Sequence, residues 1–152
     1  SEIKKIRPDI PISSDFIVGF PGEKKSDFHE TMQLVEEVKF DNSYSFIYSQ
    51  RPGTPAAGMK DNVSDVEKKQ RLNELQELLN VYATERSEKL LGSIQSCLVS
   101  GKSKKNKDEY QARTECNRVV NFDSNGIDLA GQLVNIRIND VLANSLRGTI
   151  EH

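Results

Sequence analysis

Several residue types and motifs are rare or missing in this sequence of 152 residues, which has no tryptophan, two cysteines and two histidines. No apolar run approaches the ~20 residues that a membrane-spanning helix needs, which argues against a membrane protein. The sequence also lacks the phosphate-binding P-loop pattern and any Ser/His/Asp arrangement. Nothing at its start resembles a signal peptide, so we expect a globular cytoplasmic protein with no membrane partner.

The cysteines and histidines are not placed like metal ligands or catalytic groups. Cys97 and Cys116 have no Cys or His neighbour at metal-ligand spacing, and each lies among apolar or β-forming residues. His29 falls on the polar side of a predicted helix. We therefore predict unpaired structural thiols, a solvated histidine, no metal site and no catalytic residue in this chain.

Charge is distributed unevenly along the sequence, whose net charge is -2. Residues 1–92 contain 13 Lys and Arg against 16 Asp and Glu, whereas residues 93–152 contain 8 against 7. An acidic surface repels a polyanion, so a nucleic acid cannot be bound over the whole molecule. Any RNA-binding face must be local.

The N-terminal part has the pattern of a β-α-β unit. An apolar run over residues 11–20 ends at Pro21-Gly22 and suits a strand covered on both faces. Ser26 or Asp27 can cap a helix that ends near residues 40–42, and residues 44–49 form a second strand that chirality makes parallel to the first. The apolar positions that recur at helical spacing are Phe28, Met32, Val35 and Val38.

Two parallel strands and one helix cannot cover both faces of a sheet, so we expect this unit to be completed by missing N-terminal chain or by another copy. The sequence begins without Met, and residues 2–7 resemble the end of a helix. Ser1 and Glu151-His152 are either native residues or residues added by cloning. We therefore expect a chain truncated at its start, whose exposed sheet edge could form a non-native dimer.

A long helix is predicted to connect this unit to the rest of the chain. Ser64 and Glu67 have the spacing of a capping box, and Gly92 is placed to end the helix. The apolar stripe of this helix comprises Leu72, Leu75, Leu79, Tyr82 and Leu90.

The C-terminal part reads as a run of short strands. Strict alternation over residues 134–139 predicts one buried and one wet face, and Asn125-Gly126 is typical of a type I′ hairpin. About 60 residues of short antiparallel strands favour a five-stranded, OB-like all-β barrel that follows the α/β unit. The predicted strands cover residues 94–100, 117–122, 133–139 and 145–150.

Two loops that follow predicted strands each leave two interpretations open. Residues 19–23 either approach a ligand, with Glu23 as an acceptor, or form a tight turn with Glu23 at a helix start. Arg51, in a loop with two prolines, either holds an anion or caps a helix end. The aromatic residues of the second strand favour the core over a stacking surface; they are Tyr44, Phe46 and Tyr48.

Basic residues recur through the C-terminal part. A Lys-rich predicted loop over residues 102–107 is followed by Arg113, Arg118 and Arg147. Lys and Arg neutralise phosphates, while Asn and Ser reach sugars or base edges. These groups either converge on one RNA-binding face or are separately solvated.

Longer motifs carry a resemblance to a known family. They are SDFIVGFPGE at residues 14–23, FIYS at 46–49, RPGTPAA at 51–57, RTE with NRVV at 113–120, and NSLRG at 144–148. Over nearly its whole length the chain resembles the C-terminal part of MiaB-type tRNA methylthiotransferases. The resemblance implies a radical-SAM enzyme that adds a methylthio group to isopentenyl-adenosine beside the tRNA anticodon.

The resemblance also implies an organisation and cofactors. Residues 1–62 would be the end of a radical-SAM (β/α) barrel, residues 63–91 a connector helix, and residues 92–150 a TRAM domain that binds the tRNA anticodon stem-loop. The parent enzyme would use S-adenosyl-L-methionine and two 4Fe-4S clusters. This chain lacks the Cys-x-x-x-Cys-x-x-Cys run and the other three cluster cysteines. We therefore expect no bound cofactor and no activity from this chain alone.

Site residues follow from the same resemblance. Those expected beside the cofactor are Ile17, Val18, Gly19, Phe20, Phe46 and Tyr48. Those expected to face RNA are Lys102, Lys104, Lys105, Arg113, Asn117, Arg118, Asn144 and Arg147. Two alternatives stay open: a free-standing RNA-binding module without catalysis, and a methylthiotransferase that acts on a ribosomal protein.

Overall fold

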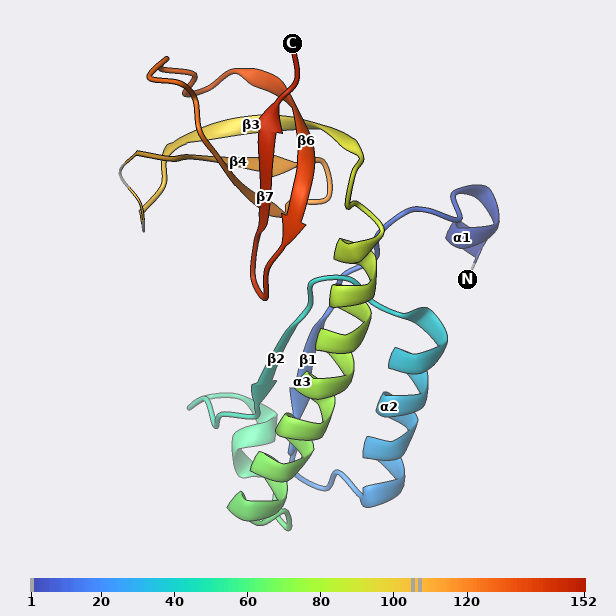
Figure 1. Cartoon of the computed structure of the whole chain (residues 1–152). Helices are drawn as coiled ribbons and strands as arrows, with labels where there is room; N and C mark the ends of the chain where they lie inside the picture. Colours follow the sequence, from blue (N-terminus) through green and yellow to red (C-terminus); the bar gives the residue numbers. More distant parts are fainter. Residues whose placement is uncertain (1, 105, 107) are drawn as a thin grey trace. The chain divides into compact units, whose positions relative to one another are not determined.

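The computed structural model describes residues 2–104, 106 and 108–152. The chain folds into two compact units, residues 1–83 and 84–152. The helices are α1 (Glu2–Ile6), α2 (Lys25–Val38), the 3-10 helix η1 (Pro55–Gly58) and α3 (Asp65–Glu88). The strands are β1 (Asp15–Val18), β2 (Tyr44–Ile47), β3 (Ile94–Lys102), β4 (Tyr110–Thr114), β5 (Val119–Phe122), β6 (Leu133–Val141) and β7 (Leu146–Ile150). Figure 1 shows this order of elements along the chain.

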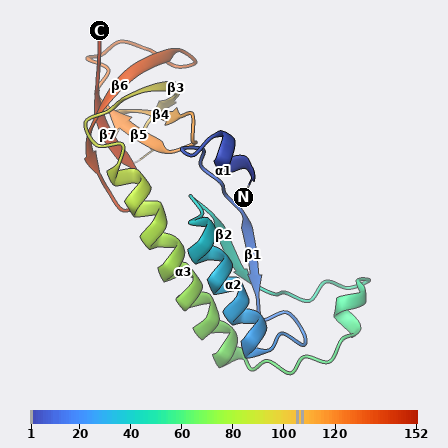
Figure 2. The ribbon, with the colours of Figure 1, turned by 90° about the vertical axis from the view of Figure 1, so that its right-hand side faces the viewer.

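The first unit is built on a parallel pair of strands, as the sequence predicts. In the register of β1 and β2, Asp15 is opposite Tyr44 and Ile17 is opposite Phe46. Helices α2 and α3 pack on one face of this pair (Figure 2). The core between the helices and the strands contains Phe16, Val18, Phe28, Val35, Phe40, Leu75 and Leu79.

The other face of this sheet is open, which corrects two expectations. Ile17 is 59% exposed, and on the neighbouring strand Phe46 is 54% and Tyr44 is 70% exposed. Strand β1 is therefore covered on one face only, and Tyr44 and Phe46 on β2 lie outside the core. Side chains alternate along a strand, so Phe16 and Val18 face the helices while Ile17 faces away from them.

The helix ends differ in part from the prediction. Lys24 is the N-cap of α2, and Asp27 lies inside the first turn, where its Oδ2 accepts the Lys24 N–H at 2.8 Å. The predicted cap at Ser26 or Asp27 is therefore wrong by a few residues. At the start of α3, the Ser64 hydroxyl accepts the Glu67 N–H at 3.2 Å, as the capping-box pattern predicts.

The second unit is a closed five-stranded barrel in the order β3-β4-β5-β7-β6, which confirms the predicted fold class. All five strands are labelled in Figure 2. Four of its strand pairs are antiparallel, but β5 and β7 are parallel. The expectation of a wholly antiparallel barrel is therefore wrong at this pair. The interior side chains are Cys97, Val99, Tyr110, Ala112, Val120, Phe122, Ile136, Ile138 and Leu146.

Two turns of the barrel also differ from the prediction. Strand β4 was not predicted, and Asn117 lies in the turn between β4 and β5 with a φ of 63° rather than at the start of a strand. Asn125 and Gly126 have the positive φ values of a type I′ turn, 54° and 80°. They do not form a hairpin, because β5 pairs with β4 and β7, and β6 lies elsewhere in the barrel.

Close packing in the barrel explains one glycine of the NSLRG motif. A Cβ atom at Gly148 would lie 2.5 Å from the backbone oxygen of Arg137 on the neighbouring strand. We expect Gly148→Ala to destabilise the barrel by roughly 2 kcal/mol, because overpacking forces the backbone apart. Urea unfolding followed by circular dichroism measures this cost.

The matched control for this variant is Gly58→Ala, because a Cβ atom at Gly58 has nothing within 4 Å. It should leave the unfolding midpoint unchanged. Equal midpoints for the two variants would contradict the packing argument.

Candidate nucleic-acid interface and cofactor face

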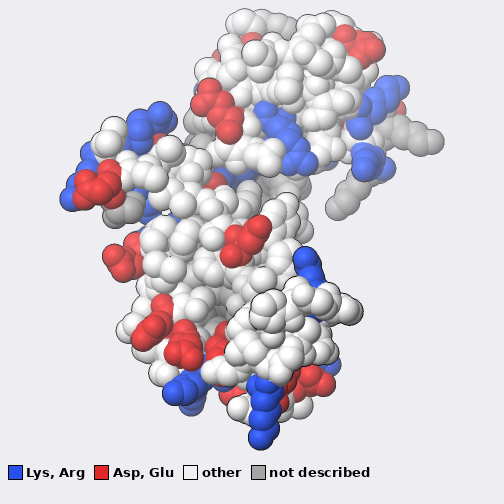
Figure 3. All heavy atoms as spheres, turned by 180° about the vertical axis from the view of Figure 1, so that it is seen from behind, with Lys and Arg blue, Asp and Glu red and all other residues white. Residues whose placement is uncertain are grey.

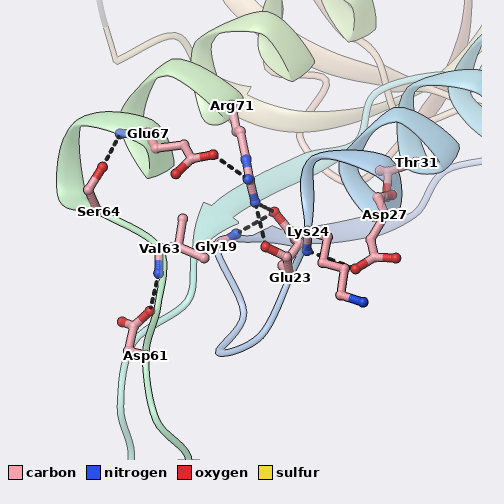
Figure 4. A network of polar contacts seen from close by, with 10 residues as sticks. All are labelled: Gly19, Glu23, Lys24, Asp27, Thr31, Asp61, Val63, Ser64, Glu67 and Arg71. Carbon is pink, nitrogen blue, oxygen red and sulfur yellow. Dashed lines mark hydrogen bonds and ion pairs between the residues drawn. The ribbon is translucent and has the colours of Figure 1, made fainter.

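A buried ion pair holds the loop that leaves β1. Arg71, on α3, donates from Nη1 to Glu23 Oε1 at 2.5 Å and to the Glu23 backbone oxygen at 3.2 Å. Its Nη2 also donates to Glu67 Oε1 at 2.5 Å. Glu23 Oε1 accepts the Gly19 N–H at 3.2 Å, so one carboxylate joins the two ends of the loop (Figure 4). Glu23 is therefore engaged within the protein, and the turn interpretation of residues 19–23 describes it better.

Gly19 is required where this loop meets α3. Gly19 has a φ of 71°, and a Cβ atom there would lie 2.5 Å from Lys68 Cγ. The aliphatic part of Lys68 therefore packs directly on the Gly19 backbone, while its ammonium group pairs with Asp61. The hydrogen bond from Lys68 lowers the pKa of Asp61 below its usual range.

The six residues expected beside a cofactor do not share one surface. Ile17 and Phe46 are neighbours on the open face of the sheet, whereas Val18 is 1% exposed and faces the core. Phe20 packs edge-on against Tyr48 at 5.1 Å between ring centroids, beyond the C-terminal ends of the strands. The open face and these end residues can offer an apolar and aromatic surface, but Val18 can contribute only its backbone.

The arginines expected to face RNA are held in different ways. Arg113 is exposed and donates from Nη1 to the Asn117 backbone oxygen at 3.1 Å and to Asn117 Oδ1 at 3.3 Å. Arg147 is 49% exposed and donates to Glu109 Oε1 at 2.6 Å. Both guanidinium groups therefore lie at the surface, each held by hydrogen bonds to one neighbouring residue, and both can still contact an anionic partner.

The other expected RNA-facing groups are partly on the same unit's surface. Lys102, Lys104 and Asn144 are exposed, and Lys105 lies outside the described residues. Figure 3 shows Lys and Arg side chains at several places on one side of the barrel, among largely uncharged atoms. The basic character of the barrel is thus spread in small groups and does not form one continuous patch in that view.

Arg118 is a correction to the predicted set, because it is only 5% exposed. Its Nε donates to the Ser87 hydroxyl on α3 at 2.9 Å, and its Nη1 lies 3.5 Å from Cys116 Sγ. A buried guanidinium that is hydrogen-bonded within the protein supports the β4–β5 turn and is not presented to RNA. The sequence pattern could not distinguish it from Arg113, because both lie in one polar segment.

Two amides that the sequence analysis did not single out lie between the surface arginines. Gln111 on β4 is opposite Asn121 on β5, and Asn121 is opposite Arg147 on β7. Both amides are half-buried. The signal that could have identified them is alternation along β4 and β5, which places them on the outer face with Arg113.

The cysteines are free thiols, as predicted, with Cys97 fully buried and Cys116 partly buried. Burial, with a smaller effect of Cys116, raises the pKa of Cys97 to about 11. Among residues 2–104, 106 and 108–152, no group of three or more His, Cys, Asp and Glu side chains could hold a metal ion. Within the same residues, no helix combines the length and apolar character of a membrane span.

Comparisons with known proteins find one matching domain family and several similar enzymes that share a single name. Residues 88–150 match the TRAM domain family. The chain is 54% identical over 149 residues to the tRNA-2-methylthio-N(6)-dimethylallyladenosine synthase of Serratia proteamaculans, a match that covers 98% of this chain and 31% of the relative. Enzymes of the same name from Hahella chejuensis and Photorhabdus laumondii are both 56% identical, over 96% and 98% of this chain and 33% and 31% of their own lengths. The chain thus spans about a third of the length of these curated relatives.

The Arg71–Glu23 pair generates a stability prediction. Arg71→Met leaves the Glu23 carboxylate, which is only 12% exposed, without its cation. We expect a loss of about 3 kcal/mol in the free energy of unfolding of the first unit, because removing one partner of a buried pair is costly. Urea denaturation measures the loss, and the double variant Glu23→Gln with Arg71→Met should recover part of it.

Lys69→Met is the control, since Lys69 is an exposed residue of the same helix. It should change the free energy of unfolding by less than about 0.5 kcal/mol. If Arg71→Met behaved like this control, the pair would contribute no more than a surface salt bridge.

Arg118 and Arg113 should behave oppositely when replaced. Arg118→Met should lower the stability of the barrel by roughly 1–3 kcal/mol, because its buried hydrogen-bond partners are left unsatisfied. Arg113→Met, at an exposed position, should leave stability nearly unchanged. Thermal unfolding compares the two variants, and a lower melting temperature for Arg113→Met alone would reverse the assignment.

Proposed function

Because the chain carries a TRAM domain and is homologous to the C-terminal third of MiaB-type tRNA-2-methylthio-N(6)-dimethylallyladenosine synthases, we propose that it works as the RNA-binding C-terminal region of such an enzyme. According to their names, the relatives synthesise 2-methylthio-N(6)-dimethylallyladenosine in tRNA. In this proposal the barrel engages a tRNA anticodon stem-loop in the cytoplasm, and the radical-SAM chemistry belongs to the whole enzyme.

The observation that carries the proposal is the outer face of the barrel. Arg113 and Arg147 present guanidinium groups at the surface, and Lys102, Lys104 and Asn144 are exposed on the same unit. Cations at a barrel surface neutralise phosphates, and exposed amides reach sugars and bases. Arg118 is left out of the proposed contact set because it is buried.

For the first unit we propose only that it forms part of the surface that borders the cofactor. The open face with Ile17 and Phe46, and the aromatic pair Phe20 and Tyr48, can border the adenosine part of S-adenosyl-L-methionine. Bound S-adenosyl-L-methionine would supply the radical chemistry of the enzyme. The two iron-sulfur clusters do not fit the described part of this chain, which offers no cluster-binding group. Their ligands would have to come from other parts of the enzyme.

Two alternative functions are less well supported. A free-standing RNA-binding module would not explain the similarity to the relatives, which covers 98% of the chain and therefore extends beyond the barrel. A methylthiotransferase that modifies a ribosomal protein is disfavoured by the names of the relatives, which specify tRNA.

Binding of the chain to an anticodon stem-loop RNA tests the proposal. The logarithm of the binding constant, measured by fluorescence anisotropy, should fall linearly with the logarithm of the salt concentration. Arg113→Ala and Arg147→Ala should each weaken binding roughly tenfold and reduce the magnitude of the slope by about 0.7–0.9, because each removes one phosphate contact.

Lys69→Ala is the charge-matched control, because it removes an exposed cation of α3 outside the barrel. Its affinity and salt slope should match those of the unmodified chain. If the two arginine variants also kept the original affinity and slope, the proposed RNA face would be wrong.

A further inference from the structure

The outer face of β4, β5 and β7 carries a row of uncharged amides between cations. Strand register places Gln111 opposite Asn121 and Asn121 opposite Arg147, so these three residues form one row across three neighbouring strands. Arg113 lies two residues from Gln111 on β4 and therefore points to the same outer face. Side chains directly opposite one another have Cβ atoms about 5 Å apart. The two amides are thus adjacent, with one arginine beside each.

These amides have unused hydrogen-bonding groups. The structure records no hydrogen bond from either side-chain amide to another residue of the described chain, although both residues are half-buried. A carboxamide has two N–H donors and a carbonyl acceptor. Neither amide is among the buried polar atoms that lack a partner, so water reaches both groups and an external ligand can replace that water.

The chemistry of the row favours a nucleobase over a phosphate. A phosphate offers only acceptors, and the arginines already supply charged donors for it. An amide supplies a donor and an acceptor side by side, which matches the edge of a base. In double-stranded RNA the major groove is too deep and narrow for side chains to read, and the minor groove is recognised mostly by shape and 2′-hydroxyl contacts, so a donor and an acceptor side by side favour an unpaired base.

Glu109 reduces the attraction of this face for polyanions in general. Its carboxylate, 19% exposed, accepts from Arg147 at 2.6 Å. Since β5 lies between β7 and β4, the Arg147 side chain reaches across β5 to the residue that precedes β4. One of the two cations beside the amides is therefore already paired with a carboxylate, which weakens its attraction for a phosphate but leaves its other N–H groups able to donate. Selectivity at this face then depends more on the neutral amides.

We infer that Gln111 and Asn121 hydrogen-bond the edge of an unpaired base in a single-stranded RNA loop, while Arg113 and Arg147 contact the adjoining phosphates. This inference rests on the proposed function, because it assigns a ligand to the same RNA-binding barrel. It adds a base-reading site to a surface otherwise described by its charges.

The test compares an RNA hairpin that has a single-stranded loop with a blunt RNA duplex that repeats the stem. Gln111→Met and Asn121→Leu keep the side-chain size but remove the amides. Each should weaken binding to the hairpin about tenfold, the loss expected for one base contact. Binding to the duplex and the salt slope should stay unchanged, because no charge is removed.

Asn135→Leu is the matched control, because Asn135 is an exposed amide on β6, outside the row. Gln111→Ala and Asn121→Ala provide a second set of variants, and thermal unfolding verifies that each variant is folded. Agreement between the two sets separates loss of the amide from the effects of a larger apolar side chain.

The outcomes distinguish this inference from the proposal on which it rests. If the unmodified chain bound neither RNA, the proposed function and the base-reading site would both fail. If Arg113→Ala weakened hairpin binding but the amide variants bound normally, only the base-reading site would be overturned. Equal losses on hairpin and duplex would also overturn it, because the amides would then contact the RNA backbone.

Discussion

The ion pair between Arg71 and Glu23 is the contact on which the first unit depends. A sheet of two strands has little hydrogen bonding of its own, so its stability comes from the helices packed on one face. Arg71 ties α3 to the loop that leaves β1, and Lys68 packs on Gly19 one turn earlier along the same helix. The start of α3 is therefore part of the first unit's core and is not a passive linker.

This arrangement keeps the end of β1 in place while the opposite face of the sheet stays open. Ile17 and Phe46 lie on that face, where a ligand or further protein can be accommodated. Glu23 serves to hold the loop, since its carboxylate is used by Arg71 and by the Gly19 N–H. A loop held in this way places Phe20 beyond the end of β1, where its ring packs against Tyr48, the residue that follows β2.

In the second unit, the closure of the five strands into a barrel is the constraint that determines which residues lie side by side. Strand β7 lies between β5 and β6, so Arg147 reaches a row that also includes Gln111 and Asn121, although these residues are far apart in sequence. Closure also places Gly148 against the backbone of β6, where no side chain fits. Arg118, in the turn between β4 and β5, is buried, and its Nε donates to Ser87 on α3.

Local patterns in the sequence were sufficient to predict the parallel β-α-β unit, the Ser64 cap, the free thiols and a five-stranded barrel. Periodicity and capping act between residues that are close in the chain, so they can be recognised without the tertiary structure. Motif resemblance predicted the similarity to MiaB-type enzymes, which the relatives show over 98% of this chain and about a third of their own length. Tertiary structure alone decided that Tyr44 and Phe46 are exposed, that Arg118 is buried while Arg113 is not, and that Glu23 is paired with Arg71. Burial and pairing depend on which distant segments pack together. The residues around Arg113 and Arg118 therefore do not indicate which of the two arginines is buried.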